Sequence, residues 1–413
     1  MAEAEIIAVG SELLTADKID TNSLFLTSQL NDIGIEVVRK IVVGDERARL
    51  AESVRNAASR SAIVILSGGL GPTEDDVTRD AVAAALGREL VFSEDVCEAI
   101  RARFRSFGRK MSEVNKRQAF VIAGAEVLPN PRGTAPGQWV DTGACVVALL
   151  PGPPRELKPM FVEECIPRLR ARFPARVIRT RLFRATGIGE GDLDQTIAPV
   201  YTRYSNPVTT ILASSGDIQI HLRAQSDTEE EAEQLLDEVG AQILPLLGDK
   251  VYSRNGDPLE KVIGAALRQR GQTLAVAESC TGGLLGGRIT SVPGSSDYFR
   301  GGFVTYTNEM KTALLGVPPE LIERHTEVSE PVARAMAEGA RRGTGADYAL
   351  SITGYAGPDG GTLDNAVGTV FIGLATPTAD SDVRRLRLPG DRDRIRGFAV
   401  QNALDMLRRA LGI

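Results

Sequence analysis

The sequence Ala275-Val276-Ala277-Glu278-Ser279-Cys280-Thr281-Gly282-Gly283 predicts a strand that turns sharply into a helix. The apolar run 273–277 is typical of a buried strand, and a helical pattern starts near Leu284. Backbone N–H groups and the positive end of the helix dipole meet at such a turn. Ser279 is therefore placed as a nucleophile beside an oxyanion hole. The alternative is that Ser279 or Thr281 only caps the helix.

The sequence on both sides of this turn predicts an α/β domain over 257–413. Helices are expected at 259–270, 284–290, 311–342 and 394–411, and strands at 273–277, 302–307, 349–353, 369–374 and 383–388. Continuous apolar strands that alternate with helices indicate a mainly parallel sheet covered on both faces. The expected architecture is three-layer α/β.

A second α/β domain of the same three-layer type is predicted over 1–172. Its strands are expected at 6–9, 35–43, 62–66 and 144–150, and its helices at 21–30, 47–60, 77–86 and 155–172. Loops after Val9, Leu66 and Leu150 would converge, because ligands bind at the carboxyl ends of parallel strands. The polar segment 111–139 is predicted to be loop.

The loop Gly68 to Asp76 is the strongest motif of this N-terminal half. Its glycines would let backbone N–H groups cradle a phosphate. Glu74, Asp75 and Asp76 could hold a hard divalent cation, or the two aspartates could simply favour the start of the next helix. The loop is neither a Walker loop nor GxGxxG.

The segment 173–253 predicts a small α+β unit between the two domains. Strands are expected at 177–185 and 218–224, and a long helix at 228–247. Gly187-Ile188-Gly189 could be a nucleotide loop, but a plain turn is the prediction. Residues 253–256 form the expected linker.

Length and composition indicate an ordinary soluble protein of several domains. The chain has 413 residues, 43% hydrophobic and 25% charged, with net charge −6. This charge argues against a general nucleic-acid or membrane-surface binder. No apolar run approaches the about 20 residues of a membrane span. The acidic start and four cysteines without CxxC spacing predict a cytoplasmic protein with reduced thiols.

A serine nucleophile needs a base, and Lys311 is the preferred choice. Lys and Arg together number 48, and nearly all are arginine, which cannot deprotonate in a protein. If the strands before Ser279 and Lys311 end at one sheet edge, the two side chains can meet as a Ser-Lys pair. Alternatives are Lys311 as a surface residue, Cys280 as the nucleophile, and a triad built on His325.

At these residues the chain closely resembles the CinA family of competence/damage-inducible proteins. The matching motifs are 277–283, 306–311, 328–330, 351–354, 356–361, 367–370 and 390–392. The resemblance implies a nicotinamide mononucleotide deamidase of pyridine-nucleotide salvage, without a cofactor, in which Ser279 and Lys311 are catalytic and Tyr306 assists. The implied substrate-binding residues are Glu278, Cys280, Thr281, Gly282, Gly283, Thr353, Gly354, Ala356, Gly357 and Arg392.

The N-terminal half resembles the molybdopterin-binding domain family on Gly68 to Thr73 with Asp75, Asp76 and Thr78. In CinA proteins this resemblance implies a metal-dependent ADP-ribose pyrophosphatase, with the metal held by Asp75 and Asp76. The nucleotide-site residues it implies are Gly10, Glu12, Asn22, Gly68, Gly69, Gly71, Pro72, Thr73, Asn115, Arg117 and Gly152. The middle unit resembles the family's KH-type domain, but no basic GxxG loop predicts nucleic-acid binding.

The expected partners are therefore nicotinamide mononucleotide, ADP-ribose and a second copy of the chain, without nucleic acid or membrane. The identity of the metal is open. Two other readings remain: an enzyme active only in its C-terminal half, and a non-enzymatic nucleotide sensor or partner-binding protein linked to competence.

Overall fold

The computed structural model describes residues 2–174, 176–378 and 380–413. The chain forms two compact units, Met1–Arg179 with Gln225–Glu233, and Thr180–Ala224 with Gln234–Ile413. The three domain boundaries expected from the sequence remain predictions.

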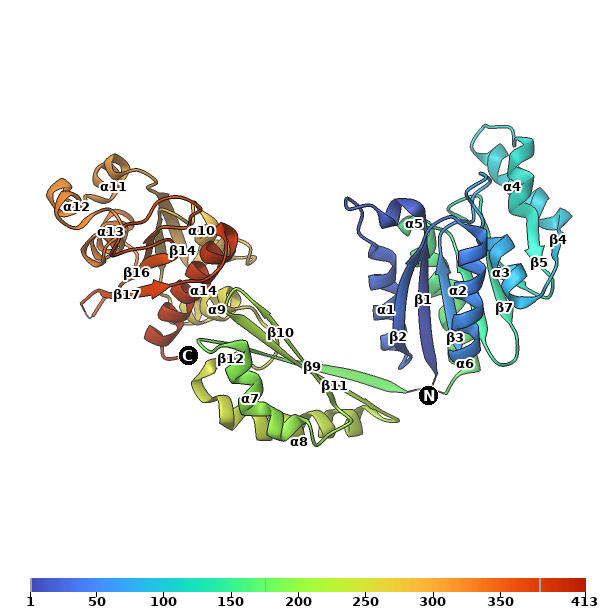
Figure 1. Cartoon of the computed structure of the whole chain (residues 1–413), viewed down its shortest axis with the longest axis horizontal. Helices are drawn as coiled ribbons and strands as arrows, with labels where there is room; N and C mark the ends of the chain where they lie inside the picture. The colour runs from blue at the N-terminus through green and yellow to red at the C-terminus, as the bar shows by residue number, and fades with distance from the viewer. Residues whose placement is uncertain (1, 175, 379) are drawn as a thin grey trace. The chain divides into compact units, whose positions relative to one another are not determined.

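A six-stranded sheet forms the centre of the first unit (Figure 1). Its order is β2 (Glu36–Val43), β1 (Glu3–Val9), β3 (Ile63–Ser67), β8 (Val146–Leu150), β7 (Gly137–Asp141) and β6 (Glu126–Leu128). The first four strands are parallel, and β7 and β6 are antiparallel additions. The carboxyl ends of β1, β3 and β8 therefore share one edge.

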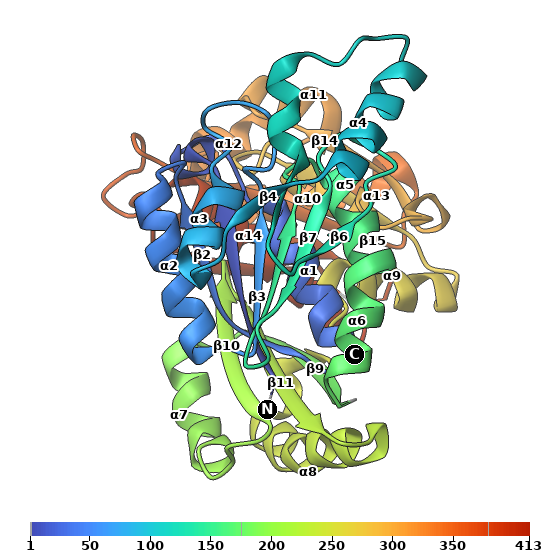
Figure 2. The same ribbon diagram turned by 90° about the vertical axis from the view of Figure 1, so that its right-hand side faces the viewer.

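Helices cover both faces of this sheet because its strands are apolar on both sides. Helices α2 (Arg47–Arg60) and α3 (Thr78–Leu86) pack on one face. Helices α1 (Thr21–Asp32), α5 (Pro154–Met160) and α6 (Ile166–Arg172) pack on the other. Figure 2 shows α2 and α6 on opposite sides of the strands.

The prediction that 111–139 is loop was wrong. The segment holds the 3-10 helix η2 (Glu113–Ala119) and strand β5 (Phe120–Ile122), which pairs with β4 (Leu90–Phe92), as well as β6 and β7. Helix α4 (Glu94–Ser106) packs beside η2. This helix was not predicted from the sequence. The strands are short, and one core position is polar: Gln138 is fully buried and bonds Ile122 N and Phe120 O. The sequence of this region therefore lacks the continuous apolar run that would have predicted a strand.

The small α+β unit has a four-stranded sheet in the order β10 (Val208–Ser214), β11 (Asp217–Ser226), β9 (Val177–Thr186), β12 (Val251–Ser253). Helices α7 (Glu190–Tyr201) and α8 (Glu229–Leu247) accompany it. Residues 187–189 form a turn between β9 and α7, as predicted.

The C-terminal sheet has the order β14 (Phe299–Val304), β13 (Leu274–Glu278), β15 (Tyr348–Gly354), β16 (Thr369–Ala375), β17 (Asp382–Arg387). Strands β14, β13 and β15 are parallel; β16 pairs antiparallel with β15, and β17 pairs antiparallel with β16. Helices α9 (Leu259–Arg270), α10 (Leu284–Thr290) and α14 (Arg392–Ala410) cover one face. Helices α11 (Asn308–Leu315), α12 (Pro319–His325) and α13 (Glu330–Thr344) lie on the other.

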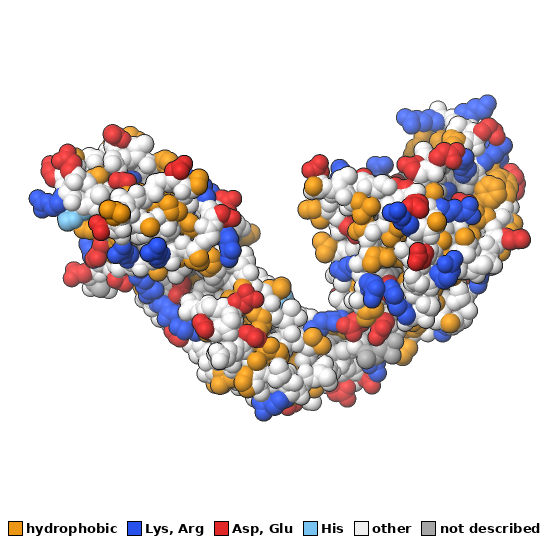
Figure 3. All heavy atoms as spheres, in the orientation of Figure 1, with side chains coloured by type: hydrophobic (Ala, Val, Ile, Leu, Met, Phe, Trp, Pro, Cys, Tyr) orange, Lys and Arg blue, Asp and Glu red, His pale blue; other side chains and the backbone are white. Residues whose placement is uncertain are grey.

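The predicted fold class, two three-layer α/β domains with a small α+β domain between them in sequence, is confirmed. Acidic and basic side chains are interspersed over the face shown in Figure 3. Within the described residues, no helix is both long and apolar enough to cross a membrane.

Candidate functional site

Ser279 and Lys311 meet at the carboxyl edge of the C-terminal sheet. Ser279 directly follows β13, and its N–H donates to Ile352 O of β15 at 2.9 Å. The neighbouring strand β14 ends in register with β13, and α11 begins four residues later. Lys311 lies in the first turn of α11 and points back, so that its Nζ is 3.3 Å from Ser279 Oγ in a hydrogen bond.

Burial lowers the pKa of the Lys311 amine. The residue is only 1% exposed, and desolvation disfavours its charged form; the carboxylate of Glu327 opposes this shift with a smaller effect. A neutral amine can accept a proton from the serine hydroxyl. The pair therefore has the chemistry of a nucleophile and its base.

The alternative nucleophile and base are less suited to this chemistry. Burial raises the pKa of the Cys280 thiol to about 11, so the thiol is protonated at neutral pH. His325 ends α12, where it is exposed to solvent. Lys261 is a surface residue that pairs with Asp257 at 2.6 Å.

Glu278 holds the turn that follows β13, instead of facing a substrate as predicted. It is 1% exposed, and its carboxylate accepts from the N–H groups of Gly283 (3.1 Å), Leu285 (3.0 Å) and Gly286 (2.8 Å). Gly282 N–H donates to Ser279 O at 3.0 Å. The amides of Gly282 and Gly283 are thus occupied. Among the described residues, no other residue accepts from Cys280 N–H, which leaves this amide for an oxyanion, whereas Thr281 is fully buried.

Glu278→Gln is expected to lower kcat for the reaction at Ser279 by at least tenfold and to lower Tm. The amide presents an NH₂ donor to backbone N–H groups that need an acceptor, which costs about 1–3 kcal/mol. Thermal unfolding and steady-state kinetics would measure both effects, with KM changing little. Glu323→Gln, at an exposed position of α12, is the control. Unchanged kcat in Glu278→Gln would remove Glu278 from this positioning role.

Two arginines of α14 reach the same edge. Arg392 donates to Gly357 O at 2.7 Å and to the Tyr306 hydroxyl at 3.0 Å. Arg396 donates to Thr281 O at 2.8 Å and so fixes the Thr281–Gly282 peptide of the turn that follows Ser279. Arg396 was not predicted from the sequence, although its spacing of four residues from Arg392 puts both on one face of a helix.

Several predicted substrate contacts are part of the packed core. Thr353 is fully buried and donates to Glu327 O at 2.8 Å, and Ala356 is 4% exposed. Gly354 packs tightly against β16, where an added Cβ would lie 2.7 Å from Val370 Cγ2. These residues pack beneath the site and do not line it. Gly357 is buried as well, whereas Arg392 is exposed and Tyr306 is 58% exposed.

In the first unit, the three predicted loops converge on a cavity of about 300 Å³. Its lining combines the glycine-rich loop with residues after β1 and β8: Val9, Glu12, Gly68, Gly69, Leu70, Gly71, Pro72, Asp76, Gln118, Thr134, Ala135, Pro151, Gly152, Pro153 and Glu156. Buried Arg79 donates to Leu70 O at 2.6 Å and to Gly71 O at 2.8 Å, which holds the loop in place.

Other predicted residues of this half lie around that cavity. Asn22 donates to Gly152 O at 2.7 Å and lines an adjoining cavity of about 190 Å³ that also includes Glu12. Thr73 and Arg117 line a neighbouring cavity of about 390 Å³. Gly10 precedes the turn η1 (Ser11–Leu14). Asn115 serves a structural role, because it forms a capping box with Ser112.

The predicted metal ligands do not form a cation site by themselves. Asp76 accepts from Thr73 N–H at 2.9 Å, Asp75 is exposed, and Glu74 is paired with Arg117. In the part of the chain that the structure describes, no group of three His, Cys, Asp or Glu residues could hold a metal ion. Of these carboxylates, Asp76 bonds within the loop itself, and Glu74 pairs with Arg117 of η2.

Comparison with known proteins identifies each part of the chain. Residues 5–171 match the model of a probable molybdopterin binding domain, 180–253 the damage-inducible protein CinA KH domain, and 256–411 the CinA C-terminal domain. A protein of known crystal structure, the competence/damage inducible protein CihA from Agrobacterium tumefaciens, shares 37% sequence identity with this chain. The match covers 38% of this chain and 94% of the CihA chain, with a TM-score of 0.37.

Relatives of similar length match the whole chain. A CinA-like protein of Solibacter usitatus is 58% identical over 409 residues, which is 99% of this chain and 98% of the relative. A CinA-like protein of Koribacter versatilis is 50% identical over 412 residues, which is 99% of each. With such identity over nearly its full length, the chain belongs to the CinA family.

Proposed function

We propose that the C-terminal half is a nicotinamide mononucleotide deamidase. It would convert this nucleotide and water to nicotinic acid mononucleotide and ammonia. The observation that supports the proposal best is the hydrogen bond between Ser279 and a buried lysine whose pKa is lowered. A hydroxyl next to a neutral amine is the arrangement that an amide-cleaving Ser-Lys pair requires.

The reaction would proceed through an acyl-enzyme. Lys311 Nζ takes the proton of Ser279 Oγ, and this oxygen attacks the carboxamide carbon. The N–H group of Cys280 stabilises the resulting oxyanion. Lys311 then returns the proton to the amide nitrogen, and ammonia leaves. A water molecule gives a proton to Lys311 and attacks the ester, which releases the acid and restores Ser279.

Tyr306 and Arg392 are proposed to receive the nucleotide at the surface of the site. Their side chains are bonded to each other, and Arg392 also holds Gly357 of the loop after β15. A guanidinium in this position can meet the phosphate of the substrate. Ammonia release by the purified full chain, with identification of nicotinic acid mononucleotide as the second product, tests the proposal. Absence of both products would contradict it and favour a sensor or partner-binding protein.

We also propose a second activity, hydrolysis of the ADP-ribose diphosphate, for the N-terminal half. The observation that supports it is the cavity at the Gly68 to Gly71 loop, where backbone groups from three loops face one space. Such loops bind phosphate through their N–H groups. The requirement for a divalent metal remains a prediction, and an enzyme active only in its C-terminal half is the alternative.

Gly68→Ala is expected to lower ADP-ribose hydrolysis at least tenfold. Gly68 has φ of 106°, and an added Cβ would lie 2.4 Å from Val9 O, so the loop must move away from β1. Detection of AMP and ribose 5-phosphate measures the effect. Gly87→Ala is a matched control, since φ is also positive (63°) but a Cβ would meet nothing within 4 Å. Equal losses in both variants would mean that the loop has no special role.

A further inference from the structure

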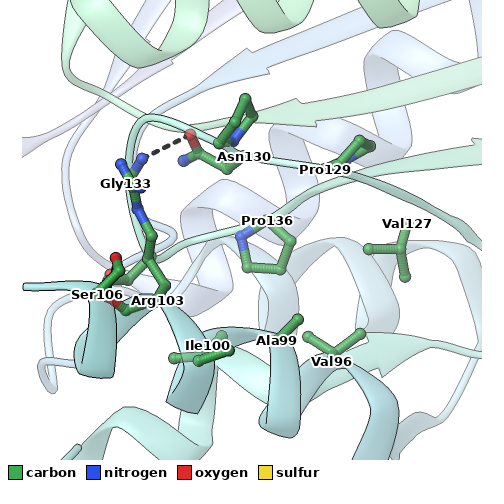
Figure 4. A pocket seen from close by; sticks show the side chains of 13 residues that line it. Val96, Ala99, Ile100, Arg103, Ser106, Val127, Pro129, Asn130, Gly133 and Pro136 are labelled. Atoms are coloured by element: carbon green, nitrogen blue, oxygen red, sulfur yellow. Dashed lines mark hydrogen bonds between the residues drawn. The ribbon is translucent and has the colours of Figure 1, made fainter. Parts of the chain in front are cut away.

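A cavity of about 440 Å³ lies between α4 and the segment 127–136 (Figure 4). One wall is the face of α4 with Val96, Ala99 and Ile100; Val127 and the prolines of the 127–136 segment form the other. Its volume lies within the range of small-molecule sites, and its walls are mostly apolar, as in such sites. Neither of the two proposed reactions places a ligand group in this cavity.

This cavity adjoins the cavity at the glycine-rich loop. Thr134 lines both. The wall between them is fixed: Asn130 donates to Ala135 O at 2.8 Å and to Glu156 at 2.9 Å, and accepts from Gly133 N–H at 2.9 Å. Figure 4 draws the last of these bonds. A ligand with its base in one cavity and its phosphates in the other would therefore have to pass beside Thr134, the lining residue that the two spaces share.

The polar side chains of the cavity gather at one end. In Figure 4, Arg103 and Ser106 lie with Gly133, whereas Val96 and Val127 lie away from them. The Arg103 guanidinium lies over the Phe107 ring, 4.4 Å from its centroid. No carboxylate of the described residues forms an ion pair with Arg103, and its Nε is buried without a hydrogen-bond partner. An oriented guanidinium without an acidic partner suits a phosphate.

We propose that this cavity binds the heteroaromatic base of a nucleotide whose phosphates lie between Arg103 and the Gly68 to Gly71 loop. The flat faces of Pro129 and Pro136 and the apolar face of α4 would enclose the ring. The inference rests on the proposed phosphate chemistry of the N-terminal half and adds the place where the rest of the ligand is recognised. It predicts that a base increases affinity at this site.

Ala99→Trp tests this inference with AMP and ribose 5-phosphate, which share a ribose phosphate and differ in the base. Ala99 is exposed on α4, so an indole there can enter the cavity without displacing the core. Isothermal titration of the full chain should show AMP binding at least tenfold tighter than ribose 5-phosphate. In Ala99→Trp, AMP affinity should fall at least tenfold, and ribose 5-phosphate affinity should not change.

The control is Ala84→Trp, at an exposed position of α3 that lines none of the cavities described above. It should bind both ligands as the parent chain does. Unchanged AMP affinity in Ala99→Trp, or an equal loss for both ligands, would overturn the base site while leaving the phosphate loop intact. If the parent chain bound neither ligand, the proposed N-terminal activity and the base site would both fall.

Discussion

Ser279→Ala is expected to abolish ammonia release from nicotinamide mononucleotide, with kcat lower by roughly four orders of magnitude or more. The loss removes the attacking group itself, because Lys311 is bonded to this oxygen. Since the side chain is small and 8% exposed, removal of one oxygen should leave Tm nearly unchanged. An ammonia-coupled assay and thermal unfolding measure the two effects.

Cys280→Ala is the matched control for this experiment. The thiol is the neighbouring nucleophile, but its raised pKa keeps it protonated, so the variant should retain activity within a few-fold. The opposite result, with Ser279→Ala active and Cys280→Ala inactive, would transfer the covalent step to sulfur. Activity in both variants would refute an acyl-enzyme at this turn.

The meeting of Ser279 and Lys311 could be predicted from the sequence because it depends only on topology. Each residue follows the end of a parallel strand, and adjacent parallel strands end at one sheet edge. The lysine was recognisable because this chain uses arginine nearly everywhere else. Strand order and the direction of the first helical turn then bring the side chains together.

The roles of Glu278 and Arg396 could not be predicted in the same way. A glutamate beside a serine at the end of a strand suggests substrate binding, and only the path of the next helix shows that three amides use its carboxylate. Arg396 reaches Thr281 O across 115 positions of sequence, which depends on how α14 packs against the sheet. Such contacts have no local periodicity.

In the N-terminal half, too, the features set by strand topology could be predicted, and the contacts of single side chains could not. The convergence of three loops followed from parallel strands, and the structure contains it. Strand β7 was missed because a fully buried glutamine occupies a core position that is usually apolar. The aspartates were predicted as metal ligands, but Asp76 bonds the loop itself. Their role as metal ligands therefore stays a prediction.

Lys311→Met is expected to eliminate the deamidase activity and, at the same time, to stabilise the protein. Methionine keeps the length of the side chain and cannot accept a proton, so attack by Ser279 loses its base. Lys311→Arg should also be inactive, because a guanidinium does not deprotonate in a protein. Lys261→Met is the control on the surface of α9, where the lysine pairs with Asp257 and activity should be retained.

The expected stability change follows from the lowered pKa of the lysine. The unfolded chain binds a proton at residue 311 more readily than the folded chain, so this lysine destabilises the fold at neutral pH. That cost is complete below the folded pKa, decreases as pH rises towards the unfolded value, and is absent above it. Lys311→Met should therefore gain about 0.5–2 kcal/mol at neutral pH and progressively less in alkaline buffer.

The parent enzyme should show the same titration in its rate. The neutral amine is the active form, so kcat/KM should rise with pH through the lowered pKa of Lys311 and then level off. A residue that only filled the core would show neither the rise in rate nor the gain in stability on replacement. If Lys311→Met were inactive but also less stable, loss of packing would explain the result, and the lysine would no longer be supported as the base.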